Sequence, residues 1–114
     1  MGQDAFISYS HKNKQVADTI VASLEQGNIR CWYAPRNLSP GSSWSEEIMT
    51  AIESVRVFVV IITDESIPSQ HVLNEIASAQ NSGASIIPLI LTKAPLSKSM
   101  KYYSFGIVLK WVNI

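Results

Sequence analysis

The sequence has 114 residues, which is enough for one domain with a single hydrophobic core and too few for two. Hydrophobic residues make up 46% of it and charged residues 16%, a composition that excludes intrinsic disorder. The nine basic and nine acidic residues cancel to a formal net charge of zero. This balance argues against nucleic-acid binding through phosphate contacts and against a polybasic membrane anchor.

The cysteine and histidine content argues against a metal site. Cys31 is the single cysteine, so neither a disulfide framework nor a cysteine zinc cluster can form. His11 and His71 are too far apart in the sequence for a metal-binding motif. The sequence does not begin with the charged and then apolar stretch of a secretory signal peptide. Its apolar runs are far shorter than the roughly 20 residues of a membrane span. We therefore expect a cytoplasmic domain without a metal and without a membrane contact.

The first elements are predicted from an alternation of apolar and amphipathic stretches. Residues 5–7 form an apolar run typical of a strand. Residues 16–24 have apolar side chains at helical spacing, and Gly27 is expected to end that helix in the left-handed conformation. A second apolar, β-prone run over residues 29–33 predicts the next strand.

A long loop and a second amphipathic helix follow. Two prolines and a glycine between residues 34 and 43 predict an exposed loop. Ser43 and Glu46 have the spacing of a capping box, which predicts that a helix starts there. The inner face of that helix would carry Ile48, Met49, Ile52 and Val55.

The second half begins with six consecutive apolar residues over 57–62, which indicate a strand covered on both faces. A helix is expected over residues 69–82, ended by Gly83, and a strand over residues 86–91. Pro88 lies within that strand and has no N–H to donate, so we expect it near a sheet edge or at a bulge.

Residues 106–112 complete a set of five predicted strands. Strands that alternate with helices predict βαβ crossovers, and hence a parallel sheet with helices on both faces. Five strands in a short chain favour the flavodoxin-like order 2-1-3-4-5 in an α/β three-layer fold. Ligands bind at the carboxyl ends of the strands in such sheets, so a site should come from residues 8–11, 33–44 and 63–75.

The common catalytic motifs are not present. The sequence has no G-x-G-x-x-G after its first strand and no P-loop, which argues against these nucleotide-binding motifs. It also has no G-x-S-x-G motif, which argues against a hydrolase with a catalytic triad. Asp64 could correspond to the aspartate that response-regulator receiver domains have at the end of their third strand. However, Asp4 is the one acidic residue near the first strand and lies at its wrong end.

Three segments, in order, resemble the conserved boxes of Toll/interleukin-1 receptor (TIR) domains of the bacterial type. They are DAFISYS over residues 4–10, CWYAPRN over residues 31–37 with Pro40, Gly41 and Trp44 after it, and SQHVLNE over residues 69–75. The similarity extends from residue 4 to about residue 111, so residues 1–114 are expected to form a single TIR domain. The family's final helix would follow residue 111 and is missing, which suggests a domain excised from a longer protein.

The resemblance implies an activity and a set of site residues. Many enzymatic TIR domains cleave NAD+ at the nicotinamide–ribose bond, as NAD+ glycohydrolases or ADP-ribosyl cyclases, with NAD+ as substrate and no cofactor. By position, Glu75 would be the catalytic residue, and Arg36 would pair with the pyrophosphate. The residues expected to bind the substrate are Ser8, Tyr9, Ser10, His11, Arg36, Gly41, Trp44 and His71.

A single carboxylate is chemically sufficient for this reaction. Ordinary glycosidases need a second carboxyl group to protonate a poor leaving group, whereas nicotinamide leaves NAD+ as a neutral molecule. Glu75 could then hold the ribose hydroxyls and stabilise the oxocarbenium-like charge. His71 replaces the tryptophan of many enzymatic members, and its spacing of four residues places it beside Glu75, where it could hydrogen-bond the carboxylate.

Other interpretations of these residues stay open at the level of sequence. Glu75 could be a solvated helix residue and Arg36 a solvated loop cation, while Ser8 and Ser10 could only cap backbone groups. Trp44 could anchor the loop. The alternative function is a non-catalytic scaffold in signalling or virulence that recruits other TIR domains through residues 34–43. The two functions are compatible, because enzymatic TIR domains, which include bacterial immune effectors, commonly need self-association for activity.

Overall fold

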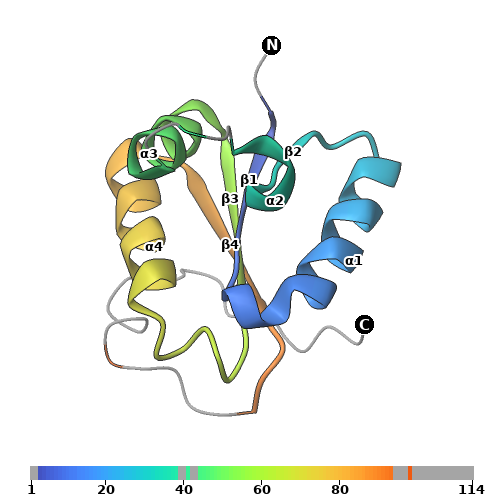
Figure 1. Ribbon diagram of the computed structural model, residues 1–114, viewed down its shortest axis with the longest axis vertical. Coiled ribbons are helices and arrows are strands. Elements are labelled where there is room, and N and C mark those ends of the chain that lie inside the picture. Colours follow the sequence, from blue (N-terminus) through green and yellow to red (C-terminus); the bar gives the residue numbers. More distant parts are fainter. Residues whose placement is uncertain (1–2, 39–40, 42–43, 94–97, 99–114) are drawn as a thin grey trace.

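The computed structural model describes residues 3–38, Gly41, residues 44–93 and Lys98 (Figure 1). The elements in chain order are β1 (Ala5–Ser8), η1 (His11–Asn13), α1 (Lys14–Gln26), β2 (Cys31–Trp32), α2 (Ala34–Asn37), α3 (Trp44–Ser54), β3 (Val57–Ile62), α4 (Gln70–Ser82) and β4 (Ser85–Ile90). The predicted alternation of strands and helices is therefore confirmed. The predicted strand over residues 106–112 and the capping serine Ser43 lie outside the described residues.

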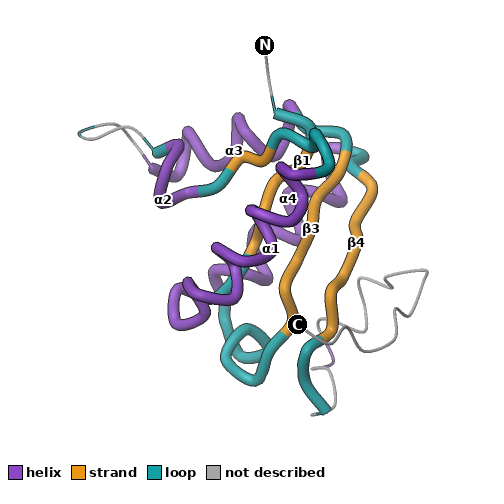
Figure 2. Tube along the Cα trace, turned by 90° about the vertical axis from the view of Figure 1, so that its right-hand side faces the viewer, coloured by secondary structure: helices purple, strands orange, loops and turns teal. Residues whose placement is uncertain are grey.

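The four described strands form one parallel sheet in the order β2-β1-β3-β4, which confirms the predicted α/β fold. Helix α1 covers one face of the sheet, and α3 and α4 cover the other (Figure 1). Figure 2 shows the molecule from another side, with β3 and β4 running next to each other to the right of α1. β3 pairs with a strand on each side and is covered on both faces, which explains its unbroken apolar sequence.

Side-chain alternation along the strands divides the apolar core in two. On the side of α3 and α4, the Phe6 ring stacks on Trp32 at 4.9 Å and on Phe58 at 5.5 Å between ring centroids. On the side of α1, Ile7 belongs to the second core cluster. Successive strand residues point to opposite faces, so Ser8 points to the same side as Phe6, toward α4. This alternation directs the Ser8 hydroxyl toward α4, where it contacts a residue of the site described below.

Two helix ends test the predicted stop signals. Gly83 has a φ of 82° and ends α4 in the left-handed conformation, as predicted. Gly27 has a φ of −88°, so the left-handed conformation predicted for it is wrong. Asn28 takes that conformation instead, with a φ of 65°, because asparagine tolerates the left-handed region better than other residues with a side chain.

Other differences from the prediction are local. Residues 34–37 form the short helix α2 rather than a loop, because Pro35 lies in its first turn, where a missing N–H breaks no helical hydrogen bond. β2 has two residues rather than five. Met49 was assigned to the inner face of α3 but is 47% exposed. Pro88 lies on β4, at an edge of the described sheet, and the strand predicted beyond it lies outside the described residues.

The described residues include no helix that is both long enough and apolar enough to cross a membrane. They also contain no group of three or more His, Cys, Asp or Glu side chains that could hold a metal ion. Cys31 is buried, and this burial raises the pKa of its thiol to about 11. The thiol therefore stays protonated at neutral pH and behaves as part of the core.

Candidate functional site

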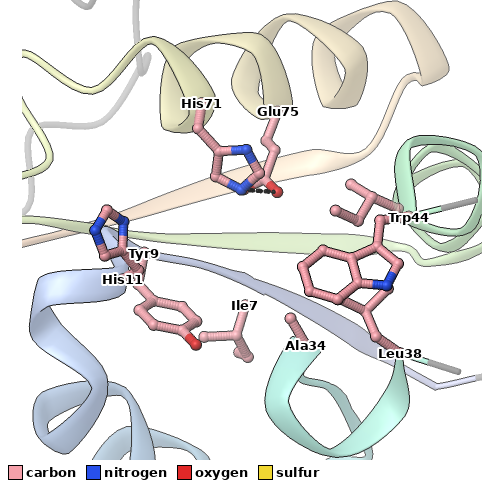
Figure 3. A pocket seen from close by; sticks show the side chains of 9 residues that line it. Ile7, Tyr9, His11, Ala34, Leu38, Trp44, His71 and Glu75 are labelled. Atoms are coloured by element: carbon pink, nitrogen blue, oxygen red, sulfur yellow. Dashed lines mark ion pairs between the residues drawn. The ribbon is translucent and has the colours of Figure 1, made fainter. Parts of the chain in front are cut away.

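A pocket of about 190 Å³ opens at the carboxyl ends of β1 and β2, between α2, α3 and α4 (Figure 3). It is lined by Ile7, Tyr9, His11, Ala34, Leu38, Trp44, Ile48, His71 and Glu75. Its position agrees with the edge of the sheet at which the sequence predicted a site. Five of the predicted site residues meet there although they come from three separate segments of the chain: Tyr9 and His11 after β1, Trp44 at the start of α3, and His71 and Glu75 on α4.

Glu75 lies in the second turn of α4, and this helix fixes its position. Ser69 caps the helix by accepting a hydrogen bond from the backbone N–H of Val72 at 3.2 Å. Val72 and Ile76 are buried against the sheet and hold the helix in its orientation. Glu75 shares this inner face and is only 6% exposed. A carboxylate is therefore placed at the wall of the pocket rather than in bulk water.

Both oxygens of Glu75 have hydrogen-bond partners. Ser8 donates from its hydroxyl to Glu75 Oε1 at 2.6 Å, and this contact is buried. His71 Nε2 lies 3.0 Å from Glu75 Oε2, one helical turn away, as its sequence spacing predicted (Figure 3). The hydrogen bond to Glu75 is the largest influence on His71 and raises the pKa of its imidazole. The result is a buried carboxylate held by one hydroxyl and one titratable ring.

The remaining predicted residues at the pocket come from the segment after β1 and from the start of α3. Tyr9 packs its ring against Tyr33 at 5.6 Å between centroids, and burial raises the pKa of its hydroxyl, which stays neutral. His11 begins η1 and is exposed. Trp44 begins α3 and is 62% exposed while its ring still lines the pocket. An aromatic surface is thus available beside the carboxylate.

Four predicted substrate-binding residues, Ser8, Ser10, Arg36 and Gly41, do not line the pocket. Ser10 accepts a hydrogen bond from the backbone of Lys12 and caps η1, which is the capping role considered from the sequence. Arg36 forms a bidentate ion pair with Glu25 of α1, at 3.0 and 2.6 Å, and donates to the Cys31 carbonyl at 2.9 Å. Arg36 is thus directed to α1 and not to the pocket, because its guanidinium is held by Glu25.

Gly41 is exposed, has a φ of 78° and is not among the residues that line the pocket. Ser8 also does not line the pocket, but it reaches Glu75 from behind. The structure therefore places the Ser8 hydroxyl against Glu75 and away from the pocket surface.

The apolar wall of the pocket was not predicted. It is formed by Ile7, Ala34, Leu38 and Ile48. Ile48 follows Trp44 by one helical turn, a spacing that could have indicated a shared face. Ala34 and Leu38 reach the pocket because they lie at the two ends of α2, a helix that the sequence prediction replaced by a loop. Both residues lie within the range 33–44 from which a site was predicted, and Pro35 in the first turn was the signal for the helix.

Comparisons with known proteins identify the family. A family model described as "TIR domain" matches residues 5–108. The chain belongs to the TIR domain family. The TIR domain of the Toll-related receptor TRR-2 from Hydra magnipapillata is similar in structure, with a TM-score of 0.79 at 21% identity over 90% of this chain and 82% of that one. No curated protein matches the sequence.

Two larger proteins also contain a similar TIR fold. One is the activated Roq1 resistosome, which recognises the pathogen effector XopQ, with a TM-score of 0.70 at 21% identity over 79% of this chain and 58% of that chain. The other is a TIR-STING receptor from C. gigas, with a TM-score of 0.74 at 24% identity over 90% of this chain and 36% of that chain. This TIR domain thus spans only part of either protein, and the likeness shows the fold.

Proposed function

We propose that this TIR domain cleaves the nicotinamide–ribose bond of NAD+. The observation that carries the proposal is the position of Glu75, which is 6% exposed, lines a pocket and is hydrogen-bonded through both of its oxygens. A carboxylate so held is preorganised to stabilise positive charge or to accept hydrogen bonds from ribose hydroxyls. A solvated helix glutamate, the plain alternative, would not have these contacts.

The proposed reaction needs no second catalytic carboxylate. When the C1′–N bond breaks, the bonding electron pair moves to the nicotinamide nitrogen, and the ring leaves as a neutral molecule. The ribose is left with oxocarbenium-like charge, which water or another nucleophile then captures at C1′. Glu75 lies where such a charge would be stabilised, and the absence of a second carboxylate among the described lining residues is compatible with this chemistry.

The size and lining of the pocket support the binding of one end of the dinucleotide. Its volume of about 190 Å³ is below the roughly 300–1,000 Å³ of pockets that enclose a whole drug-sized ligand. Nicotinamide and its ribose are the part of NAD+ that must reach Glu75. The apolar side chains of Ile7 and Leu38 and the ring of Trp44 offer a surface for a flat ring.

A second candidate function is a scaffold built from associating TIR domains. Trp44 and Met49, both on α3, are among the large hydrophobic residues that are exposed in the described chain. Exposed apolar residues beside a pocket are typical of interaction surfaces. Homotypic association through residues 34–43 and α3 is compatible with catalysis, so the two functions need an experiment to separate them.

The test is the release of nicotinamide from NAD+ at high protein concentration. We expect Glu75→Gln, which keeps the shape of the side chain and removes its charge, to lower kcat by at least about 100-fold. The control is Glu53→Gln, at an exposed glutamate near the end of α3, which should keep the wild-type rate. Equal activity of wild type and Glu75→Gln would remove Glu75 from the mechanism.

If the wild type releases no nicotinamide, even when the domain is artificially clustered, the result would favour the scaffold instead. Where nicotinamide is released, chromatography of the second product separates hydrolysis, which gives ADP-ribose, from cyclisation, which gives a cyclic isomer. The two outcomes differ in whether water or the adenine attacks C1′.

A further inference from the structure

The charge of the pocket is set by one pair of residues. Glu75 carries the carboxylate, and His71 lies against it at 3.0 Å with 61% of its side chain exposed. With a protonated His71 the pair is neutral, and with a neutral His71 it carries one negative charge. The proton on His71 therefore determines what charge a ligand meets at this end of the pocket.

We propose that His71 determines substrate specificity by charge: its neutral form admits a positively charged ring beside Glu75, and its protonated form excludes that ring. The inference rests on the proposed function, because it concerns the same pocket and names its ligands as N-ribosides whose base is cationic. A tryptophan at this position would have no such effect, since its indole does not titrate.

The first reason for this charge effect is that His71 and a bound ribose compete for the Glu75 carboxylate. His71 holds Oε2 and Ser8 holds Oε1, so a ribose hydroxyl that approaches the carboxylate must share or replace one of these partners. Ser8 is buried and fixed on β1, whereas His71 is exposed and can turn outward. An imidazolium binds the carboxylate more strongly than a neutral imidazole does, because its hydrogen bond is charge-assisted. A ligand therefore displaces neutral His71 more easily.

The second reason for the charge effect is repulsion between a protonated His71 and a cationic ring. A cationic ring bound next to Glu75 would lie close to the His71 imidazole, since both residues line the same small pocket (Figure 3). Two positive charges at such a distance repel each other appreciably at a partly buried site. Deprotonation of His71 removes this repulsion and leaves the Glu75 carboxylate free to attract the ring.

Apart from His11, the other groups that face the pocket do not supply this charge. Tyr9, which follows β1, stays neutral because burial raises the pKa of its hydroxyl. Ala34 and Leu38 from α2, and Trp44 and Ile48 from α3, are not titratable. His11 is the second imidazole at the pocket, but it makes no hydrogen bond or ion pair with Glu75. A separate substitution is needed to isolate its contribution.

The direction of the pH effect follows from the ion pair. Glu75 raises the pKa of His71 above its ordinary value of 6.5, so the imidazolium persists to a higher pH than it would in a free histidine. Affinity for a cationic ring should therefore rise as the pH increases through this raised pKa. By thermodynamic linkage, the bound cation must in turn raise the acid dissociation constant of His71 by the same factor, which lowers its pKa.

The experiment measures binding without turnover. One ligand is an NAD+ analogue with carbon in place of the ribose ring oxygen next to nicotinamide, which keeps the cationic ring and forms no oxocarbenium ion. The other is the benzamide analogue of NAD+, which has the same shape and a neutral ring. Calorimetry at about pH 5.5 and about pH 8.5 brackets the titration of a histidine. We expect about tenfold tighter binding of the cationic analogue at the higher pH, and no change for the neutral one.

The variant His71→Gln keeps a hydrogen-bond donor for Glu75 but cannot become charged. It should bind the cationic analogue equally well at both pH values, whereas His11→Gln should keep the tenfold ratio. NMR titration of the His71 ring, with and without the cationic analogue, gives an independent reading of the same linkage. A pH ratio that is equal for both analogues, or that survives in His71→Gln, would overturn the proposal, as would failure of the cationic analogue to bind.

These outcomes are separate from those that test the proposed function. Binding that depends on pH through His71, without release of nicotinamide from NAD+, would reject the enzyme and retain the charge effect. Release of nicotinamide through Glu75, with an affinity that does not change with pH, would retain the enzyme and reject the charge effect.

Discussion

At the scale of single residues, we expect the hydrogen bond from Ser8 to orient the Glu75 carboxylate. Ser8 donates to Glu75 Oε1 at 2.6 Å in a buried position. A hydrogen bond to a charged group stabilises it by about 1.5–3 kcal/mol, and a buried oxygen that loses its donor finds no water to replace it. We expect Ser8→Ala to lower the kcat of nicotinamide release by about 10- to 100-fold, with a smaller change in KM.

The matched control for this prediction is Ser82→Ala. Ser82 lies at the exposed end of α4 and donates to a carbonyl of its own helix. It should keep the wild-type kcat. A kcat for Ser8→Ala within about twofold of the wild type would show that Glu75 needs no orientation from β1.

The two partners of Glu75 differ in how far they can be predicted from sequence. His71 precedes Glu75 by four residues in one helix, so their contact follows from helical geometry alone and was predicted. Ser8 is separated from Glu75 by 67 positions and meets it because β1 and α4 pack together. The sequence suggested that Ser8 belongs near the site, but only the packed structure shows that it faces Glu75 rather than the pocket.

At the scale of elements, the structure agrees with the sequence where a local pattern is sufficient. β3 has the predicted bounds because six apolar residues fit one buried strand, and α4 ends at Gly83 because glycine supports the left-handed conformation. α2 was missed because Pro35 stops a helix that precedes it and starts one that follows it, and sequence alone did not separate these roles.

Arg36 connects α2 to α1, which suggests a test at this scale. Its guanidinium binds Glu25 of α1, and α2 contributes Ala34 and Leu38 to the pocket wall. We expect Arg36→Gln to raise the KM for NAD+ by several-fold with little change in kcat, because the wall is loosened and Glu75 is untouched.

The variant Glu25→Gln separates this explanation from a direct phosphate contact. If Arg36 acts through α1, Glu25→Gln should raise KM to a similar extent, whereas a direct contact of Arg36 with the pyrophosphate would leave KM unchanged or lower it. The control is Asp4→Asn, which breaks a comparable exposed ion pair with Arg30 away from α2. Steady-state kinetics of the three variants decides between the two roles.

At the scale of the whole molecule, the pocket leaves most of a dinucleotide outside. If NAD+ is the substrate, a volume of about 190 Å³ would accept only its part near Glu75, since a pocket for a complete drug-sized ligand has roughly 300–1,000 Å³. The exposed surface of α3 lies directly beside this opening and includes Trp44 and Met49. A second copy seated on α3 would cover both the apolar surface and the protruding part of the substrate.

The specific activity of the domain should therefore rise with protein concentration. Met49 is the useful probe, because it is exposed on α3 and does not line the pocket, and its contact with α4 is the exposed hydrogen bond from Ser78 Oγ to its sulfur at 3.9 Å. A charge placed in an apolar interface weakens it, and we expect Met49→Glu to require about tenfold more protein for half-maximal specific activity. Thr19→Glu adds the same charge to the exposed face of α1, on the other side of the sheet, and should leave the concentration dependence as in the wild type. Nicotinamide release, followed alongside light scattering over a dilution series, measures activity and association together. A specific activity that stays constant on dilution would show that one copy of the domain forms a complete site, because a site shared between copies must be lost as they dissociate.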